Sequence, residues 1–278
     1  ASALTIMACA TLSASLALRD DPSCRLLLAE ACAGAGDAAR ALSTYQLALK
    51  DRRPRMQRAT ILGRMAALRL KTGESVEAGK LLLASYEAGG APAGLVAAGR
   101  AFMSAKAYDE AGEAFTRRLN LNGPREGEAE VQGFLGEVRL ALGRDREAAE
   151  SFRLALQPGA TLPEASRAGF MIGLAKACVK TGQTAEAVAT LRAAPLDDLP
   201  VAERAEALVI LGQGLAAQND FPSARDAFGR AAGLPGLEDA HRADIFEELG
   251  RAALSCGELE MAEAGFRRSL AAGSGHAP

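Results

Sequence analysis

The chain has 278 residues, of which 49% are hydrophobic but only 4% aromatic, and its formal net charge at pH 7 is −2. A nucleic-acid-binding module usually carries a clear basic excess, so this charge balance argues against RNA or DNA as the partner. Strands favour branched and aromatic side chains, so an apolar content made largely of Ala and Leu predicts an all-α protein. The abundance of Ala, Gly and Arg is typical of a GC-rich genome and favours a bacterial origin.

The first 18 residues carry no charge, yet they are barely long enough to cross a membrane and contain several Ser and Thr. We therefore expect no membrane span. The stretch also lacks the basic region that begins a signal peptide. We expect residues 1–21 to form an N-terminal helix instead. The chain begins with Ala rather than Met and shows no obvious polar capping helix at either end, which favours a processed chain or a piece of a longer one.

From residue 22 onward one pattern returns seven times, at intervals of 33 to 39 residues. Its anchor is Ala41, Ala78, Ala111, Ala148, Ala187, Ala224 and Ala262. Five residues before each anchor stands a turn residue, which is Gly36, Gly73, Lys106, Gly143, Gly182, Asn219 and Gly257. Four residues after each anchor stands a large apolar residue, which is Tyr45, Leu82, Phe115, Phe152, Leu191, Phe228 and Phe266. A fixed period of this length indicates stacked supersecondary units, and the spacing predicts helix, tight turn, helix.

Two hairpins depart from the pattern. Lys106 stands where the others have Gly or Asn, so we expect a locally different turn there, because a non-Gly residue is disfavoured in the left-handed region. Pro195 and Pro200 should end the second helix of the fifth unit near Ala194. Further prolines lie between the units, and the extra length of the period is expected in these links.

The chain resembles the tetratricopeptide repeat (TPR) family over roughly residues 22–272. The resemblance rests on Leu135-Gly136, Ala148, Phe152 and Ala155, and on the same pattern at Leu211-Gly212, Ala224, Phe228 and Ala231. It implies a right-handed α-solenoid of about seven repeats, a single array over residues 1–278 with repeats at 22–272 and a disordered tail at 273–278. No Trp stands at the early family position, and the period is longer than 34 residues. Sel1-like repeats are the nearest competing family.

The sequence contains few groups suited to catalysis or to metal binding. The two histidines, His241 and His276, do not stand with Cys at metal-ligand spacing, and no phosphate-binding glycine motif occurs. We therefore expect no metal, no cofactor and no enzyme activity. Five cysteines make an odd number, and Cys32 and Cys178 fall on the inward side of their helices. Buried reduced thiols are the simpler interpretation, with a disulfide or a reactive cysteine as the alternative. Reduced thiols favour a cytoplasmic location, with a periplasmic envelope or secretion complex as the alternative.

In the family that this chain resembles, the first helices line a concave groove that binds a peptide or helix of a partner. The resemblance therefore implies a protein-interaction scaffold. The positions that carry over to the groove are Arg64, Lys71, Arg100, Met103, Glu130, Glu137, Lys176, Lys180, Gln213, Glu247 and Arg251. A simpler interpretation of each single charge is the solvated side of an amphipathic helix. Alternative functions are a self-associating array joined through the solenoid ends and, less favoured by the charge, an RNA-binding helical-repeat protein.

Overall fold

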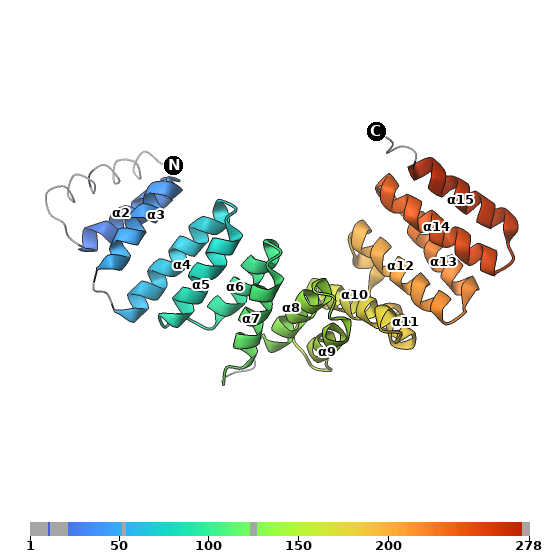
Figure 1. Cartoon of the computed structure of the whole chain (residues 1–278), viewed down its shortest axis with the longest axis horizontal. Helices are drawn as coiled ribbons and strands as arrows, with labels where there is room; N and C mark the ends of the chain where they lie inside the picture. Colours follow the sequence, from blue (N-terminus) through green and yellow to red (C-terminus); the bar gives the residue numbers. More distant parts are fainter. Residues whose placement is uncertain (1–10, 12–21, 52–53, 123–126, 274–278) are drawn as a thin grey trace. The chain divides into compact units, whose positions relative to one another are not determined.

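The computed structural model describes residues 11, 22–51, 54–122 and 127–273, and all regular structure within them is helical (Figure 1). The all-α prediction is therefore confirmed. Most of the predicted N-terminal helix at 1–21 lies outside the described residues. The predicted tail begins at Gly273, which is the last residue of a helix, and its remainder also lies outside them.

The chain divides into two compact units, Ala1–Asn122 and Gly123–Pro278. The first unit contains three helical hairpins. They are α2 (Pro22–Gly34) with α3 (Ala38–Lys50), α4 (Arg55–Lys71) with α5 (Ser75–Glu87), and α6 (Ala93–Ser104) with α7 (Tyr108–Leu119). Each hairpin joins what we call a first helix and a second helix. The second helices α3 and α5 also pack against the first helix of the following hairpin.

The second unit contains four hairpins. They are α8 (Glu128–Ala141) with α9 (Asp145–Ala155), α10 (Glu164–Lys180) with α11 (Thr184–Arg192), α12 (Val201–Ala217) with α13 (Phe221–Ala232), and α14 (Asp239–Ser255) with α15 (Leu259–Gly273). A short 3₁₀ helix, η1 (Leu196–Asp198), lies between α11 and α12. Each of α9, α11 and α13 packs against both its own first helix and the next one, so each hairpin buries the apolar side of its neighbour. The predicted early end of the second helix before Pro195 is confirmed, because α11 ends at Arg192.

The turns within the hairpins are alike. All seven predicted turn residues have positive φ, and this includes Lys106 at 58° and Asn219 at 62°. The amide of Lys106 donates to Met103 O, and the next amide donates to Phe102 O, as the amides of Gly143 and Arg144 do to Leu140 O and Arg139 O. The expectation of a different turn at Lys106 is therefore wrong. The helix-ending pair of hydrogen bonds holds the left-handed conformation there in spite of the Lys side chain.

The anchors and the aromatic residues form the core. All seven anchor alanines are buried, and the ring of Phe152 lies between two helical glycines. A methyl group on Gly136 would lie 2.8 Å from Cδ1 of Phe152, and one on Gly173 would lie 2.5 Å from Cζ of the same ring. Phe152 therefore fills the space between one hairpin and the next, since α8 and α10 approach its two sides.

The size of the residue twelve positions before the anchor matches the large apolar residue of the same hairpin. Hairpins with Phe carry Gly there, at Gly99, Gly136, Gly212 and Gly250, and each glycine contacts the ring of its own hairpin. Hairpins with Tyr or Leu carry Ala there, at Ala29, Ala66 and Ala175. This exchange keeps the volume at the helix crossing nearly constant, as close packing requires.

The extra length of the repeat is only partly in the links. Four first helices, α4, α10, α12 and α14, have 17 residues each, whereas α6 in the shortest repeat has 12. The prediction that the links hold the extra residues is therefore incomplete, because the first helices lengthen as well. The fourth residue of every 17-residue helix is an arginine that donates to a backbone carbonyl of the segment before it. These arginines are Arg58, Arg167, Arg204 and Arg242, and we call them the link arginines.

Candidate functional site

Ion pairs join the first helices of consecutive hairpins within each unit. In the first unit Arg64 on α4 pairs with Glu30 on α2. In the second unit Lys176 Nζ on α10 lies 2.6 Å from Glu206 Oε1 on α12, and α10 packs against both α8 and α12. Such pairs require that the first helices lie side by side with these positions on a shared surface. We call that surface the first-helix face of each unit.

In the first unit the predicted positions are mainly basic and accessible. Lys71 is the last residue of α4 and is exposed. Arg100 is exposed on α6, and Met103 on the same helix is half-buried. Arg64 is more than one-third exposed but has its charge balanced by Glu30.

In the second unit the basic positions are paired within the protein. Lys176 pairs with Glu206, and Lys180 Nζ lies 3.2 Å from Asp145 Oδ1 at the start of α9. Arg251 Nη2 lies 2.5 Å from Glu247 Oε1 on the same helix, α14. Exposed pairs of this kind contribute only about 0–1 kcal/mol each. Their larger effect is that these cations are less available to a partner than the sequence alone suggests.

The remaining predicted positions of the second unit lie on α8 and α12. Glu130 and Glu137 are half-buried on α8, and Gln213 is exposed on α12. The structure thus places all eleven predicted residues on first helices. It brings Lys176 into contact with the next first helix, and it directs Lys180 toward the second helix of the preceding hairpin.

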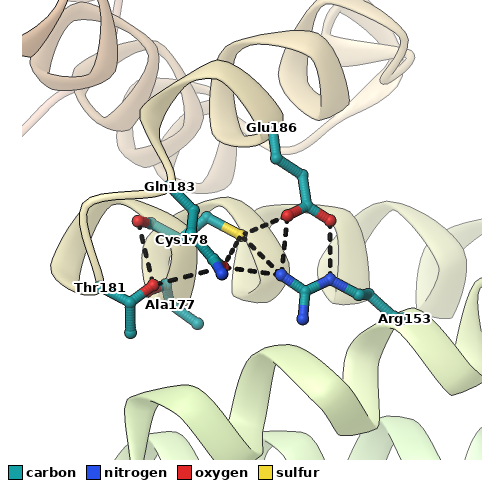
Figure 2. Close-up of polar contacts among 6 residues, drawn as sticks. All are labelled: Arg153, Ala177, Cys178, Thr181, Gln183 and Glu186. Carbon is teal, nitrogen blue, oxygen red and sulfur yellow. Dashed lines mark hydrogen bonds and ion pairs between the residues drawn. The ribbon is translucent and has the colours of Figure 1, made fainter.

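A polar cluster that the sequence reasoning missed ties the fourth hairpin to the fifth (Figure 2). Arg153 on α9 donates from Nε and Nη2 to the two carboxylate oxygens of Glu186 on α11, at 2.8 and 2.7 Å. Its Nη2 also donates to Gln183 Oε1 at 2.7 Å. The Sγ of Cys178 on α10 lies 3.5 Å from Glu186 Oε2. The signal in the sequence was an Arg and a Glu, 33 residues apart, on successive second helices.

This cluster stabilises the contact between the two hairpins and lacks a reactive group. Burial, followed by the charge of Glu186, raises the pKa of the Cys178 thiol to about 11. A cysteine nucleophile needs the thiolate, so this thiol is protonated and unreactive at neutral pH. The hydrogen bonds from Arg153 hold the pKa of Glu186 below its usual range, which keeps the pair ionised.

Of the other described cysteines, Cys32 is buried, and Cys24 and Cys256 are half-buried. The predicted burial of Cys32 and Cys178 is confirmed. His241 is exposed beside Glu238. Over the described ranges, no three His, Cys, Asp or Glu side chains gather closely enough to hold a metal ion. None of the described helices combines the length and the apolar character needed to cross a bilayer.

Comparison with known proteins agrees with this architecture. A sequence model of the tetratricopeptide repeat matches residues 22–46 and 168–193. A search of the curated proteins finds no match. Among solved structures, the C-terminal part of a TPR repeat-containing protein from Cytophaga hutchinsonii aligns with a TM-score of 0.63 at 15% identity, over 87% of this chain and 93% of that one.

Two further structures align over smaller shares of this chain. MamA has a TM-score of 0.52 at 20% identity, over 63% of this chain and 94% of its own. YrrB, described as a TPR protein with an unusual peptide-binding site, has a TM-score of 0.53 at 19% identity, over 66% of this chain and 87% of its own. At such identities the likeness concerns the fold.

Proposed function

The chain carries tetratricopeptide repeats, and from this premise we propose that it is a protein-interaction scaffold that binds a peptide or helix of a partner protein on its first-helix faces. The main support is that α10 packs against both α8 and α12, and that the Lys176–Glu206 ion pair joins α10 to α12. Parallel first helices present one strip of polar and apolar side chains along several hairpins. Helical-repeat proteins use such extended surfaces for binding.

The charges on these faces indicate which charge a partner segment should carry. On the face of the first unit Lys71 and Arg100 are exposed, and on that of the second unit Glu130 and Glu137 are half-buried near the Lys176 and Lys180 ion pairs. Taken by itself, the face of the first unit therefore suits an acidic segment, and the face of the second unit suits a basic one. YrrB, which shares the fold, is described by its peptide-binding site, and this supports a peptide as the ligand class.

We propose a binding role without catalysis or a bound cofactor. The most unusual polar cluster contains a protonated thiol and a closed ion pair, and neither group has the chemistry of a nucleophile or a general base. The cytoplasmic location, with the periplasmic alternative, stays a prediction, as do the bacterial origin and the single continuous array.

Affinity capture with charge-matched variants tests the proposal. The bait would be the wild-type chain, the face variant Lys71→Glu with Gln213→Glu, and the control Arg146→Glu with Gln46→Glu. Both variants add the same negative charge, but the control residues are exposed on the second helices α9 and α3. A partner that the control retains and the face variant loses supports the proposal. Equal capture by all three baits would move the binding surface away from the first helices.

A second candidate, self-association through the last hairpin, is favoured by one observation. On α15 the side chains of Leu259, Met261 and Leu270 are 69%, 44% and 74% exposed. The counterparts of Leu270 in earlier hairpins, Leu49 and Leu156, are half-buried and pack against the core. Sedimentation equilibrium would show a concentration-dependent mass that Leu259→Gln with Leu270→Gln abolishes. A mass that stays monomeric at every concentration would exclude this candidate.

A further inference from the structure

A hollow of about 360 Å³ lies where α11, η1, α12 and α13 meet. This volume falls within the range of small binding sites. The hollow exists because α11 has only nine residues and the link 193–200 crosses the space that a longer helix would fill. The link arginine Arg204 fixes this link, since its Nη2 donates to the carbonyls of Asp197 and Leu199.

The lining combines an apolar floor with charges at the rim. Leu191 and Leu211 are buried, and Leu196 is half-buried. The charged residues at the rim are all exposed, and they are Arg192, Arg230, Asp197 and Asp198. Within the part of the chain that the structure describes, no carboxylate oxygen lies within 4.0 Å of the Arg192 or Arg230 guanidinium.

Comparison with the other hairpins shows why Arg192 forms no ion pair with any carboxylate that the structure describes. Arg192 stands five residues after its anchor, as Arg153 does. Arg153 pairs with Glu186, which precedes the next anchor by one residue. In the next hairpin the residue one position before the anchor is Ser223, so Arg192 lacks the acidic partner that Arg153 has.

The same comparison explains Arg230. It stands six residues after its anchor, as Arg117 does, and Arg117 Nη2 lies 3.3 Å from Glu87 Oε1 in the preceding hairpin. The residue that corresponds to Glu87 is Leu196, which lines the hollow. Two cations whose counterparts form ion pairs in other hairpins thus lie beside this hollow with no carboxylate partner among the described residues.

We propose that this hollow binds a carboxylate attached to an apolar body, as in a peptide segment where Glu adjoins Leu. Two guanidinium groups suit a carboxylate because each offers a planar fork of N–H donors. The leucine floor takes the neighbouring apolar side chain. Asp197 and Asp198 repel additional negative charge, so the site favours a single carboxylate over a polyanion such as nucleic acid. The site is separate from the first-helix faces and adds a second contact on the second-helix side.

The experiment uses the full chain with ¹³C-labelled leucine methyl groups and two synthetic probes. These are acetyl-Gly-Leu-Glu-Leu-Gly-amide and the same peptide with Gln in place of Glu. The Glu peptide should shift the methyl resonances of Leu196 and Leu211, and its Kd should be about tenfold lower than that of the Gln peptide, as a charge-assisted contact requires. Equal affinity for the two peptides, or unshifted leucines at millimolar peptide, would overturn the proposal.

Four variants identify the groups responsible. Arg192→Gln with Arg230→Gln should remove the preference for Glu, whereas the control Arg55→Gln with Arg146→Gln, at two exposed arginines elsewhere, should keep it. Ser223→Glu supplies the missing acid to Arg192 and should weaken the Glu peptide several-fold while the chain stays folded. A double variant that binds like the wild type contradicts the proposal. Lys71→Glu with Gln213→Glu should leave this binding unchanged, which separates its outcome from that of the first-helix faces.

Discussion

The four hairpins with 17-residue first helices differ from the third hairpin in how they satisfy the carbonyl groups after a second helix. In the former, a link arginine reaches back, as Arg58 Nη1 does to Leu49 O at 2.9 Å and Arg167 Nη2 does to Ala160 O at 2.7 Å. In the latter, α6 is preceded by residues 88–92, where the amides of Gly89 and Gly90 bond to Tyr86 O and Ser85 O. Gly89 has a φ of 98°, which only glycine adopts readily.

The difference shows that carbonyl groups at the end of a second helix and in the link after it can be bonded either by a side chain or by the backbone. The arginine allows a longer first helix and a longer link. The glycine pair gives a short link and a short helix. This explains why the repeat length varies while the turn and the anchor stay constant.

The largest expected effect concerns the core that both kinds of hairpin share. Phe152→Ala removes the ring between Gly136 and Gly173 and should lower the free energy of unfolding by about 3–5 kcal/mol. Urea denaturation followed by circular dichroism measures it. A loss below about 1 kcal/mol would mean that the ring is not the filler between hairpins.

The second-largest change in the free energy of unfolding is expected at the link arginines. Arg58→Met keeps much of the aliphatic stem but leaves Leu49 O without this donor, so we expect a loss of about 1–2 kcal/mol in the free energy of unfolding. Arg55→Met, at an exposed arginine on the same helix, is the matched control and should change it by less than about 0.5 kcal/mol. If the two variants unfold at the same urea concentration, the link arginines do not support the long links.

The turns of the third and sixth hairpins hold Lys106 and Asn219 in the left-handed region that glycine occupies in the other five hairpins. Lys106→Gly relieves the φ of 58° and should stabilise the protein by about 0.5–1 kcal/mol, after the entropy that glycine adds to the unfolded chain. Asn219→Gly should gain less, because Asn tolerates this conformation better. Thermal unfolding of both variants provides the check. A Lys106→Gly variant that is no more stable than the wild type would show that the turn carries no strain.

The smallest effect concerns the Arg153–Glu186 tie. Because the pKa of Glu186 is lowered in the folded protein, its contribution is present above the ordinary carboxyl pKa and is lost as the pH falls through the lowered value. Glu186→Gln should therefore cost less than about 1 kcal/mol at pH 7, and this deficit should shrink as the pH falls below the ordinary carboxyl pKa. Glu150→Gln, at an exposed carboxylate on α9, should show no such pH dependence. A deficit that persists at low pH would assign the effect to packing instead of charge.

The features that could be predicted best are those in which the same residue type recurs at a fixed spacing. The anchors, the turn positions and the aromatic residues recur at fixed spacing, so hairpins, turns and core could be inferred from them. Lys106 broke the pattern of residue types but not the geometry, because backbone hydrogen bonds outweighed its local preference. The link arginines also recur at a fixed place, twenty residues before the anchor, and this signal was overlooked.

The candidate site was less predictable because ion pairs depend on the offset between helices. The sequence places Lys176 and Lys180 on one helix as two similar cations. Only the packing of α10 shows that Lys176 meets Glu206 on the next first helix and Lys180 meets Asp145 on the preceding second helix. The hollow beside Arg192 likewise arises from the early end of α11, which Pro195 predicted, and from the missing acids, which only comparison with paired hairpins reveals.

Site-specific photocrosslinking tests the central claim most directly. The photoreactive amino acid p-benzoylphenylalanine would replace Gln213, exposed on the first helix α12, or Glu150, exposed on the second helix α9, in cells of the native organism. The scaffold proposal predicts a discrete adduct with a partner protein from position 213 and none from position 150. Adducts from position 150 alone would contradict it and place the binding surface on the second helices.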